Sequence, residues 1–223
     1  MLNLKTQAAL AALCLAGAAG AATANGLANG GFETPGGDLA AGWRTAPTGN
    51  PVVLSGDAHT GAHAALLSVP GGFGASTLFQ DSFAHGGLAP LTAANVGDTP
   101  VLSFWAKGDV SPTGNIMFAL SYMGAGGSLW SSGNQFFQGQ LDAGAWTQIS
   151  FQGAAIPAGT TSVFLEINTA VGPLLDGRAN AVVIDDVQFA LAAAPVPEPG
   201  SFALLAAGLA AVGACARGRR RHA

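Results

Sequence analysis

Glycine and proline constrain most strongly what this chain can fold into. The 223-residue sequence contains 33 Gly and 12 Pro, spread along its length. Glycine weakens a helix through its conformational freedom, and proline breaks one through its missing N–H. The sequence therefore excludes a helical bundle and favours short strands separated by turns. Its length allows one domain of ordinary size or one large β-domain.

Charged residues are few and unevenly placed. They make up 9% of the chain, against about 25% in an average soluble domain. Between Asn25 and Pro195 there are 11 acidic and three basic residues, so this segment carries a charge of −8. Such an acidic surface excludes a nucleic-acid-binding protein, which needs clustered Lys and Arg, and it repels anionic lipid. It is compatible with a bound divalent cation.

Residues 1–24 have the three parts of a secretory signal peptide. Lys5 supplies the positive charge, residues 8–22 are apolar or small, and Ala22-Thr23-Ala24 has the small-x-small pattern of a cleavage site. The apolar run is about 15 residues, shorter than the roughly 20 that span a bilayer. We therefore predict a signal helix that is cleaved after Ala24, and the weaker alternative is an N-terminal membrane anchor.

The C-terminal residues 192–223 divide into three parts. A motif at 196–200 holds Pro197, Glu198 and Pro199, an apolar segment covers 201–216, and a basic tail covers 217–223. An apolar helix followed by arginines is a stop-transfer signal, because the arginines stay on the cytoplasmic side. The apolar segment is short for a transmembrane helix, which indicates a transient attachment. The prolines keep the backbone of the motif extended, and a processing enzyme can bind an extended peptide.

This tail resembles the PEP-CTERM sorting signal of Gram-negative bacteria. The resemblance implies processing by exosortase, an integral-membrane cysteine transpeptidase, and an association with exopolysaccharide production. The alternative is an ordinary C-terminal anchor behind a Pro-rich linker. We expect an exported protein at the cell surface or in the extracellular matrix, with transient inner-membrane anchoring.

The middle of the chain, residues 25–191, predicts one all-β domain. Apolar and polar residues alternate in several runs, as in 147–151, and no stretch has a helical period. Cys14 and Cys215 lie outside the domain, which is large enough to bury a core without disulfides. The pattern favours a two-sheet jelly-roll sandwich. We expect strands at 52–55, 64–69, 76–83, 101–107, 116–122, 146–151, 162–168 and 181–189.

Two motifs bracket this domain: residues 29–33 (NGGFE) open it and residues 184–189 (IDDVQF) close it. The segments 60–66, 102–107 and 146–151 lie between them. In this order the segments resemble carbohydrate-binding modules of the galactose-binding-like jelly-roll superfamily, over roughly residues 27–190. The resemblance implies a structural calcium ion, held by an acidic residue near the first strand, one in the last strand, and backbone carbonyls.

Asp185 needs a partner on physical grounds. On a regular strand it shares a face with Val187 and Phe189, so we expect its side chain to point into the core and Asp186 to face solvent. A buried, unpaired carboxylate is costly.

The resemblance makes two acidic residues, Glu33 and Asp185, the side-chain ligands of calcium, with backbone carbonyls completing the shell. The predicted ligands are Glu33, Asp185, Gly31 and Thr60. The alternative is that the two acids cap turns or pair with Arg44 or Lys107.

A sugar site in such a module needs flat aromatic rings that pack on C–H patches of the sugar. Trp105 points opposite to the apolar Phe104, and Trp130 lies in a polar segment. The domain has few aromatics for a dedicated glycan-binding protein, so a purely structural matrix or adhesion protein without a sugar site is the alternative. The candidates are Trp43, Trp105, Tyr122 and Trp130.

No catalytic constellation is evident. The domain contains no cysteine and no G-x-S-x-G elbow. His59 and His63 are four residues apart but lie in a turn without a third ligand, which favours loop histidines in solvent over a zinc site. We expect a non-catalytic exported protein that binds or organises exopolysaccharide.

Overall fold

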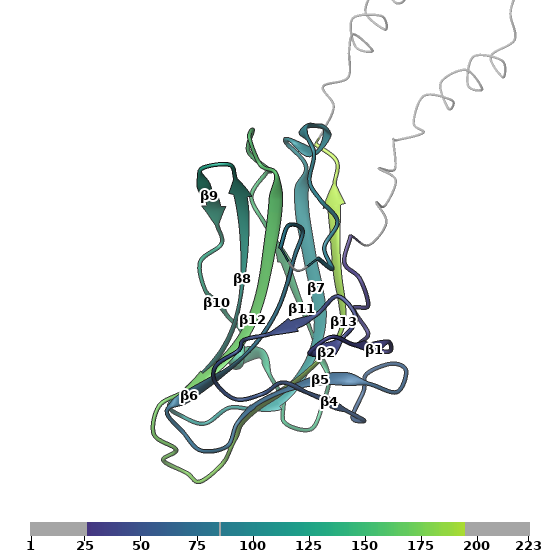
Figure 1. Ribbon diagram of the computed structural model, residues 1–223. Coiled ribbons are helices and arrows are strands. Elements are labelled where there is room, and N and C mark those ends of the chain that lie inside the picture. Colours follow the sequence, from purple (N-terminus) through teal and green to yellow (C-terminus); the bar gives the residue numbers. More distant parts are fainter. Residues whose placement is uncertain (1–25, 85, 195–223) are drawn as a thin grey trace, which may run out of the picture. The chain divides into compact units, whose positions relative to one another are not determined.

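The computed structural model describes residues 26–84 and 86–194, which form a sandwich of two antiparallel sheets (Figure 1). This confirms the predicted all-β fold class and its two layers. The predicted signal peptide, the predicted sorting motif and the predicted transmembrane helix lie outside the described residues. Within the described residues, no helix is long and apolar enough to cross a membrane.

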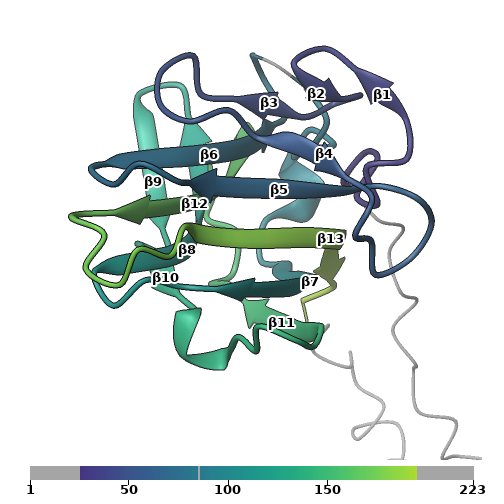
Figure 2. The ribbon, with the colours of Figure 1, turned by 90° about the horizontal axis from the view of Figure 1, so that it is seen from below.

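The first sheet has five strands in the order β11-β7-β13-β5-β4. The last strand along the chain is therefore the central one, with β7 and β5 as its neighbours (Figure 2). The strands are β4 (Val53–Ser55), β5 (Ala64–Val69), β7 (Thr99–Asp109), β11 (Thr147–Gln152) and β13 (Asn180–Ala192).

The second sheet has the order β10-β8-β12-β6-β3, and β9 also pairs with β8. A small hairpin, β1 (Pro35–Gly36) with β2 (Leu39–Ala40), and the 3-10 turns η2 (Ala93–Asn95) and η3 (Gln138–Gln140) complete the fold. The strands are β3 (Arg44–Thr45), β6 (Gly74–Asp81), β8 (Gly114–Gly124), β9 (Gly127–Ser131), β10 (Gln135–Phe136) and β12 (Ser162–Val171).

Each of the eight predicted strand ranges overlaps an observed strand, 64–69 coincides with β5, and 76–83 runs past the end of β6 at Asp81. The long strands extend beyond the predicted ends, because backbone pairing continues through residues whose side chains break the alternation. The strands that the sequence did not predict, β1, β2, β3, β9 and β10, have two to five residues. Such short pairs carry too few residues for a period of two to be recognised.

The core lies between the sheets, where each contributes one face. From β7 it takes Leu102 and Phe104, and from β8 it takes Phe118, all of them buried. The Phe104 ring meets the Phe118 ring at 5.8 Å and the Phe137 ring at 5.3 Å, both edge to face. Burying one such ring contributes about 1.5–3 kcal/mol. These contacts join the two layers without a disulfide.

The opening motif attaches the start of the domain to its end. The backbone carbonyl of Gly30 accepts a hydrogen bond from the N–H of Val187 at 2.9 Å. A Cβ on Gly30 would lie 1.9 Å from the Val187 carbonyl oxygen, so only glycine fits there. The backbone carbonyl of Asn29 accepts a hydrogen bond from the indole N–H of Trp43 at 2.9 Å. The side-chain amide of Asn29 forms hydrogen bonds with the backbone N–H and C=O of Thr34.

A buried amide holds the other end of β13. Asn180 is fully buried, and its Oδ1 accepts from the backbone N–H of Ser111 at 3.1 Å. Its Nδ2 donates to Thr169 Oγ1 at 2.6 Å and to the Ala170 carbonyl at 3.0 Å. This amide therefore links β13 to β12 and to the β7–β8 turn.

We expect Asn180→Ala to lower the free energy of unfolding by about 2–3 kcal/mol, because it leaves the Ser111 N–H buried without its acceptor. Urea denaturation measures this change. The exposed Asn134, changed to alanine as the matched control, should leave stability within about 0.5 kcal/mol. Equal stability of the two variants would contradict the role of Asn180.

Candidate functional site

Asp185 lies at a β-bulge, and this decides where it points. In the ladder of β13 with β7, Asp185 pairs with Trp105, but the next regular pair is Gln188 with Ser103. The extra residue, Asp186, has a φ of 48°. Asp185 is therefore on the outer side of the sheet with Trp105, and the prediction that it shares the core face of Val187 is wrong. The bulge reverses the alternation that this prediction assumed.

Asp185 is nevertheless fully buried, because the loop before β5 covers it. Its Oδ2 accepts from the backbone N–H groups of His59 at 2.7 Å and Thr60 at 3.1 Å. Its Oδ1 accepts from the N–H of Asp186 at 2.7 Å. Burial raises the pKa of the Asp185 carboxyl, and these donors offset only part of that effect.

Glu33 binds the same loop from the N-terminal side. Its Oε1 accepts from the backbone N–H groups of Ala62 at 2.8 Å and His63 at 2.9 Å. These two bonds hold the pKa of the Glu33 carboxyl below its ordinary value. Gly61 has a φ of 67°, and a Cβ there would lie 2.3 Å from Glu33 Oε1. The loop therefore needs glycine to pass over the carboxylate.

Asp186 also faces this loop. Its Oδ2 lies 2.7 Å from His59 Nδ1, and its Oδ1 accepts from Thr60 Oγ1 at 2.7 Å. The His59 ring stacks on Trp105, with centroids 4.0 Å apart and planes 14° apart. The predictions that Asp186 faces solvent and that His59 is a solvated loop histidine are therefore wrong. The bulge turns Asp186 toward the loop.

We call the three carboxylates, Glu33, Asp185 and Asp186, the carboxylate cluster. The four residues predicted as calcium ligands, Glu33, Asp185, Gly31 and Thr60, lie around this loop, and their role as ligands stays a prediction. A Cβ on Gly31 would lie 3.6 Å from Asp186 Oδ1 and 3.9 Å from Asp185 Oδ1.

The hydrogen bonds of the carboxylate cluster correspond to the turn-capping alternative. The predicted ion pairs do not form, because Arg44 lies near Asp38 and Lys107 bonds Asp57. Among residues 26–84 and 86–194, no three His, Cys, Asp or Glu side chains are grouped as metal ligands.

Two of the four predicted sugar-binding aromatics are in the core. Trp43 is 1% exposed and stacks on Phe32, and Tyr122 is 0% exposed, with its hydroxyl donating to the Ala154 carbonyl. Neither ring is accessible to a ligand, so these two predictions are wrong. Tyr122 points inward because it shares the strand face of Leu120. Burial raises the pKa of the Tyr122 hydroxyl.

The other two predicted aromatics are half-buried. Trp105 lies under the His59 ring, and Trp130 stacks on Tyr122 with ring centroids 4.9 Å apart. They lie on different sheets and form no common platform.

The outer side of the second sheet carries a group of aromatic and polar side chains that we call the aromatic face. Phe79 on β6 and Phe164 on β12 have ring centroids 5.7 Å apart. Glu166 lies directly opposite Phe79 in the ladder and is half-buried, and burial raises the pKa of its carboxyl. The aromatic face comprises Phe79, Met117, Ala119, Ser121, Phe164, Glu166 and Asn168.

Exposed aromatic residues surround this face. Phe83 is 60% exposed and Phe136 is 54% exposed. A shallow hollow beside Phe164 is also lined by Phe83, Ser121 and Met123. The sequence analysis missed this face, although alternation offered a signal. In β12 the buried apolar residues alternate with outward residues, which are Phe164, Glu166 and Asn168. The alternation in the sequence therefore already indicated a phenylalanine and a carboxylate on the same outer face.

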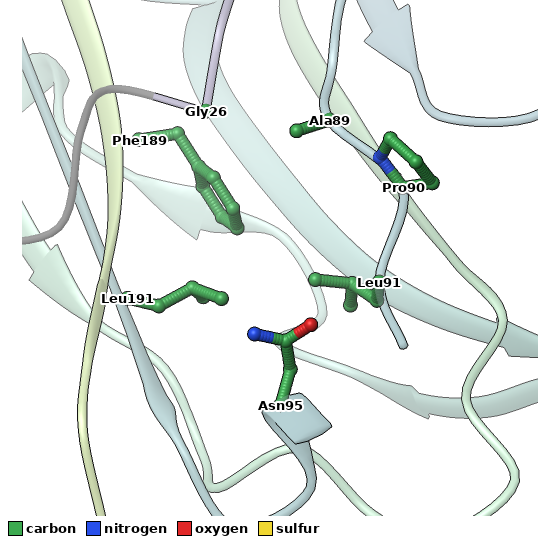
Figure 3. A pocket seen from close by; sticks show the side chains of 7 residues that line it. All are labelled: Gly26, Ala89, Pro90, Leu91, Asn95, Phe189 and Leu191. Carbon is green, nitrogen blue, oxygen red and sulfur yellow. The ribbon is translucent and has the colours of Figure 1, made fainter. Parts of the chain in front are cut away.

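A second hollow lies where the described chain starts and β13 ends (Figure 3). Gly26 is bonded there to Phe189 and Ala89 through the backbone. Phe189 and Leu191 of β13 and Leu91 from a separate segment point into the hollow, and Asn95 supplies a side-chain amide. The lining residues carry no titratable side chain, so this hollow offers apolar contact and no acid–base chemistry.

Comparisons with solved structures identify the fold. The enzymatically active domain of tailspike protein 4 from bacteriophage CBA120 is 17% identical, with a TM-score of 0.54 over 75% of this chain and 21% of that chain. A Stig cyclase from Fischerella sp. TAU is 16% identical, with a TM-score of 0.51 over 78% and 99%.

The module TmCBM61, solved with β-1,4-galactotriose, is 20% identical, with a TM-score of 0.47 over 75% and 98%. At these identities the likeness shows the β-sandwich alone. A shared fold does not by itself assign a function. No curated protein matches the chain.

The comparison with family models identifies the C-terminal segment. Residues 195–221 match the PEP-CTERM protein-sorting motif. The match includes Pro197, Glu198 and Pro199, so the sorting signal predicted from the sequence is confirmed. The chain therefore combines a β-sandwich domain with a C-terminal PEP-CTERM sorting signal.

Proposed function

We propose that this protein is exported, processed by exosortase and retained at the cell surface or in the extracellular matrix, where it binds exopolysaccharide without catalysis. The sorting motif supports the export and processing. The observation that carries the binding function is the Phe79–Phe164 pair beside the half-buried Glu166 on an open sheet face.

The chemistry of the aromatic face suits a sugar. The rings of Phe79 and Phe164 offer apolar surface to the C–H patches of a pyranose. The Glu166 carboxylate accepts hydrogen bonds from sugar hydroxyls, and Asn168 both donates and accepts. Such bonds are stronger in the partly desolvated surroundings of Glu166 than in water.

The charge of the domain narrows the class of glycan. The segment between Asn25 and Pro195 carries a charge of −8, and one of its carboxylates, Glu166, lies in the aromatic face. A polyanionic polysaccharide would be repelled. We therefore propose a neutral polysaccharide as the ligand.

The second candidate function is a structural matrix or adhesion protein without a sugar site. One observation favours it: Trp43 and Tyr122, two of the large aromatics available for stacking, are in the core.

We also propose that the carboxylate cluster binds a structural calcium ion. Glu33, Asp185 and Asp186 supply hard oxygen ligands of the kind calcium prefers, together with the oxygens of Gly31 and Thr60. Gly31 lies beside these carboxylates, since a Cβ there would be at van der Waals distance from Asp186 Oδ1 and Asp185 Oδ1. Bound calcium would offset the cost of burying Asp185 as an anion and join the first segment to the last strand.

We expect Phe164→Ala to weaken binding of the host's neutral exopolysaccharide by about twofold to tenfold, because one stacked ring is worth about 0.5–1.5 kcal/mol. Phe73, which is 82% exposed in the β5–β6 turn, is the matched control, and Phe73→Ala should leave binding unchanged. A glycan array followed by titration calorimetry measures both. If the folded protein binds no neutral glycan, the proposed sugar site is wrong and the protein is a structural matrix or adhesion protein.

Glu166→Gln should stabilise the protein at neutral pH. Since burial raises the pKa of Glu166 above 4.5, the folded state binds this proton more tightly than the unfolded state. The contribution of this proton to the stability of the folded state is complete at pH values below the pKa of Glu166 in the unfolded state. It is lost as the pH rises through the pKa of Glu166 in the folded state. Denaturation curves at about pH 4 and pH 8 should show the variant more stable only at the higher pH. The opposite order would contradict a desolvated Glu166.

Calcium should raise the melting temperature, and a chelator should reverse the effect. A free calcium concentration of about 100 times Kd would stabilise the folded state by about 2.7 kcal/mol. For a domain of this size, that raises the melting temperature by several degrees. Asp185→Asn should abolish the response, whereas Asp142→Asn at an exposed turn should retain it. Thermal melts with calcium and with chelator measure the shift, and identical transitions would exclude the ion.

A further inference from the structure

The longest open strand edge in the described part of the chain belongs to β11. All six residues of β11 pair with β7 in one regular register, and the strand forms the border of the first sheet (Figure 2). The other border strands are shorter. β3 and β10 have two residues, β4 has three, and β9 has five with an irregular register.

The hydrogen-bond pattern identifies the open backbone groups. Gly153, directly after β11, donates its N–H to the Pro100 carbonyl at 2.9 Å. Bonded pairs alternate along an antiparallel ladder, so Ile149 and Phe151 bond to β7. The N–H and C=O groups of the intervening residues are directed away from β7. These residues, Gln148, Ser150 and Gln152, are exposed.

β11 lacks the features that normally protect such an edge. Natural edge strands are short, charged, bulged or interrupted by proline, which prevents pairing with other chains. β11 is regular and contains neither charge nor proline, and no Asp, Glu, Lys or Arg occurs between Asp142 and Glu166.

We propose that β11 pairs with β11 of a second copy of this chain. Two copies that each carry −8 repel each other, and this charge-free edge is where they approach at least electrostatic cost. Antiparallel pairing of the open groups places Ser150 opposite Ser150 of the second copy. Gln148 then lies opposite Gln152, and the two-fold related strands share about six backbone hydrogen bonds.

The pairing itself does not depend on the proposed function, but its consequence for glycan binding rests on that function. The first sheet would continue from one copy into the next, while the aromatic face lies on the other sheet and stays open. A pair therefore presents two aromatic faces, and two weak sites on one particle bind a polymer far more tightly than one.

Sedimentation velocity of the processed protein tests the pairing. We expect the mass to double as concentration rises. Ser150→Pro should abolish this, because it removes an outward N–H and leaves the bonds of Ile149 and Phe151 to β7. Ser150→Ala, which keeps the N–H, should dimerise like the wild type. A wild type that stays monomeric to about 0.1 mM, or a Ser150→Pro variant that still dimerises, would overturn the proposal.

Cross-linking provides a second measurement if Ser150→Pro fails to fold. In a chain whose Cys14 and Cys215 are replaced by serine, Ser150→Cys should form an intermolecular disulfide under mild oxidation. Ser131→Cys, at an exposed position on β9, is the matched control and should react far more slowly. Equal rates for the two variants would contradict pairing at β11.

Discussion

The fold depends on how its first segment is attached to its last strand. Gly30 and Val187 share a backbone hydrogen bond, and Glu33 and Asp185 bind successive N–H groups of the loop between them in sequence. These contacts involve β13, the central strand of the first sheet. The sheet is therefore complete only when the C-terminal strand has paired with its neighbours. Pairings this distant in sequence fold slowly, because their loop-closure entropy is lost before any contact compensates for it.

Alternation made the strands predictable, and interruptions of alternation explain most of the errors. Strands as long as β5 or β12 show a period of two, whereas β3 and β10 are too short to show one. Asp185 was assigned to the wrong side because a bulge cannot be recognised from one sequence, although its need for partners was predicted from burial cost alone. Tyr122 was misassigned despite sharing the parity of Leu120, which the sequence already displayed.

The two outer faces of the sandwich differ in what they could contact. The outward residues of the second sheet combine the Phe79 and Phe164 rings with a carboxylate, Glu166, and polar groups, whereas β11 of the first sheet presents only amides and hydroxyls. Burial of Glu166 disfavours its charged form, and nothing in the core requires a carboxylate at that position. A group that costs stability where it stands is more simply explained by binding than by folding.

The end of β13 and the start of the sorting motif together determine where the chain can be cut without loss of a strand pair. Leu191 and Ala192 of β13 pair with Pro100 and Thr99 of β7, so the sheet uses the chain as far as Ala192. The sorting motif matches from residue 195. A cut within the motif leaves every described strand intact, whereas a cut a few residues earlier would remove pairs from the central strand. The domain can therefore fold before processing and keep its structure after release from the sorting segment.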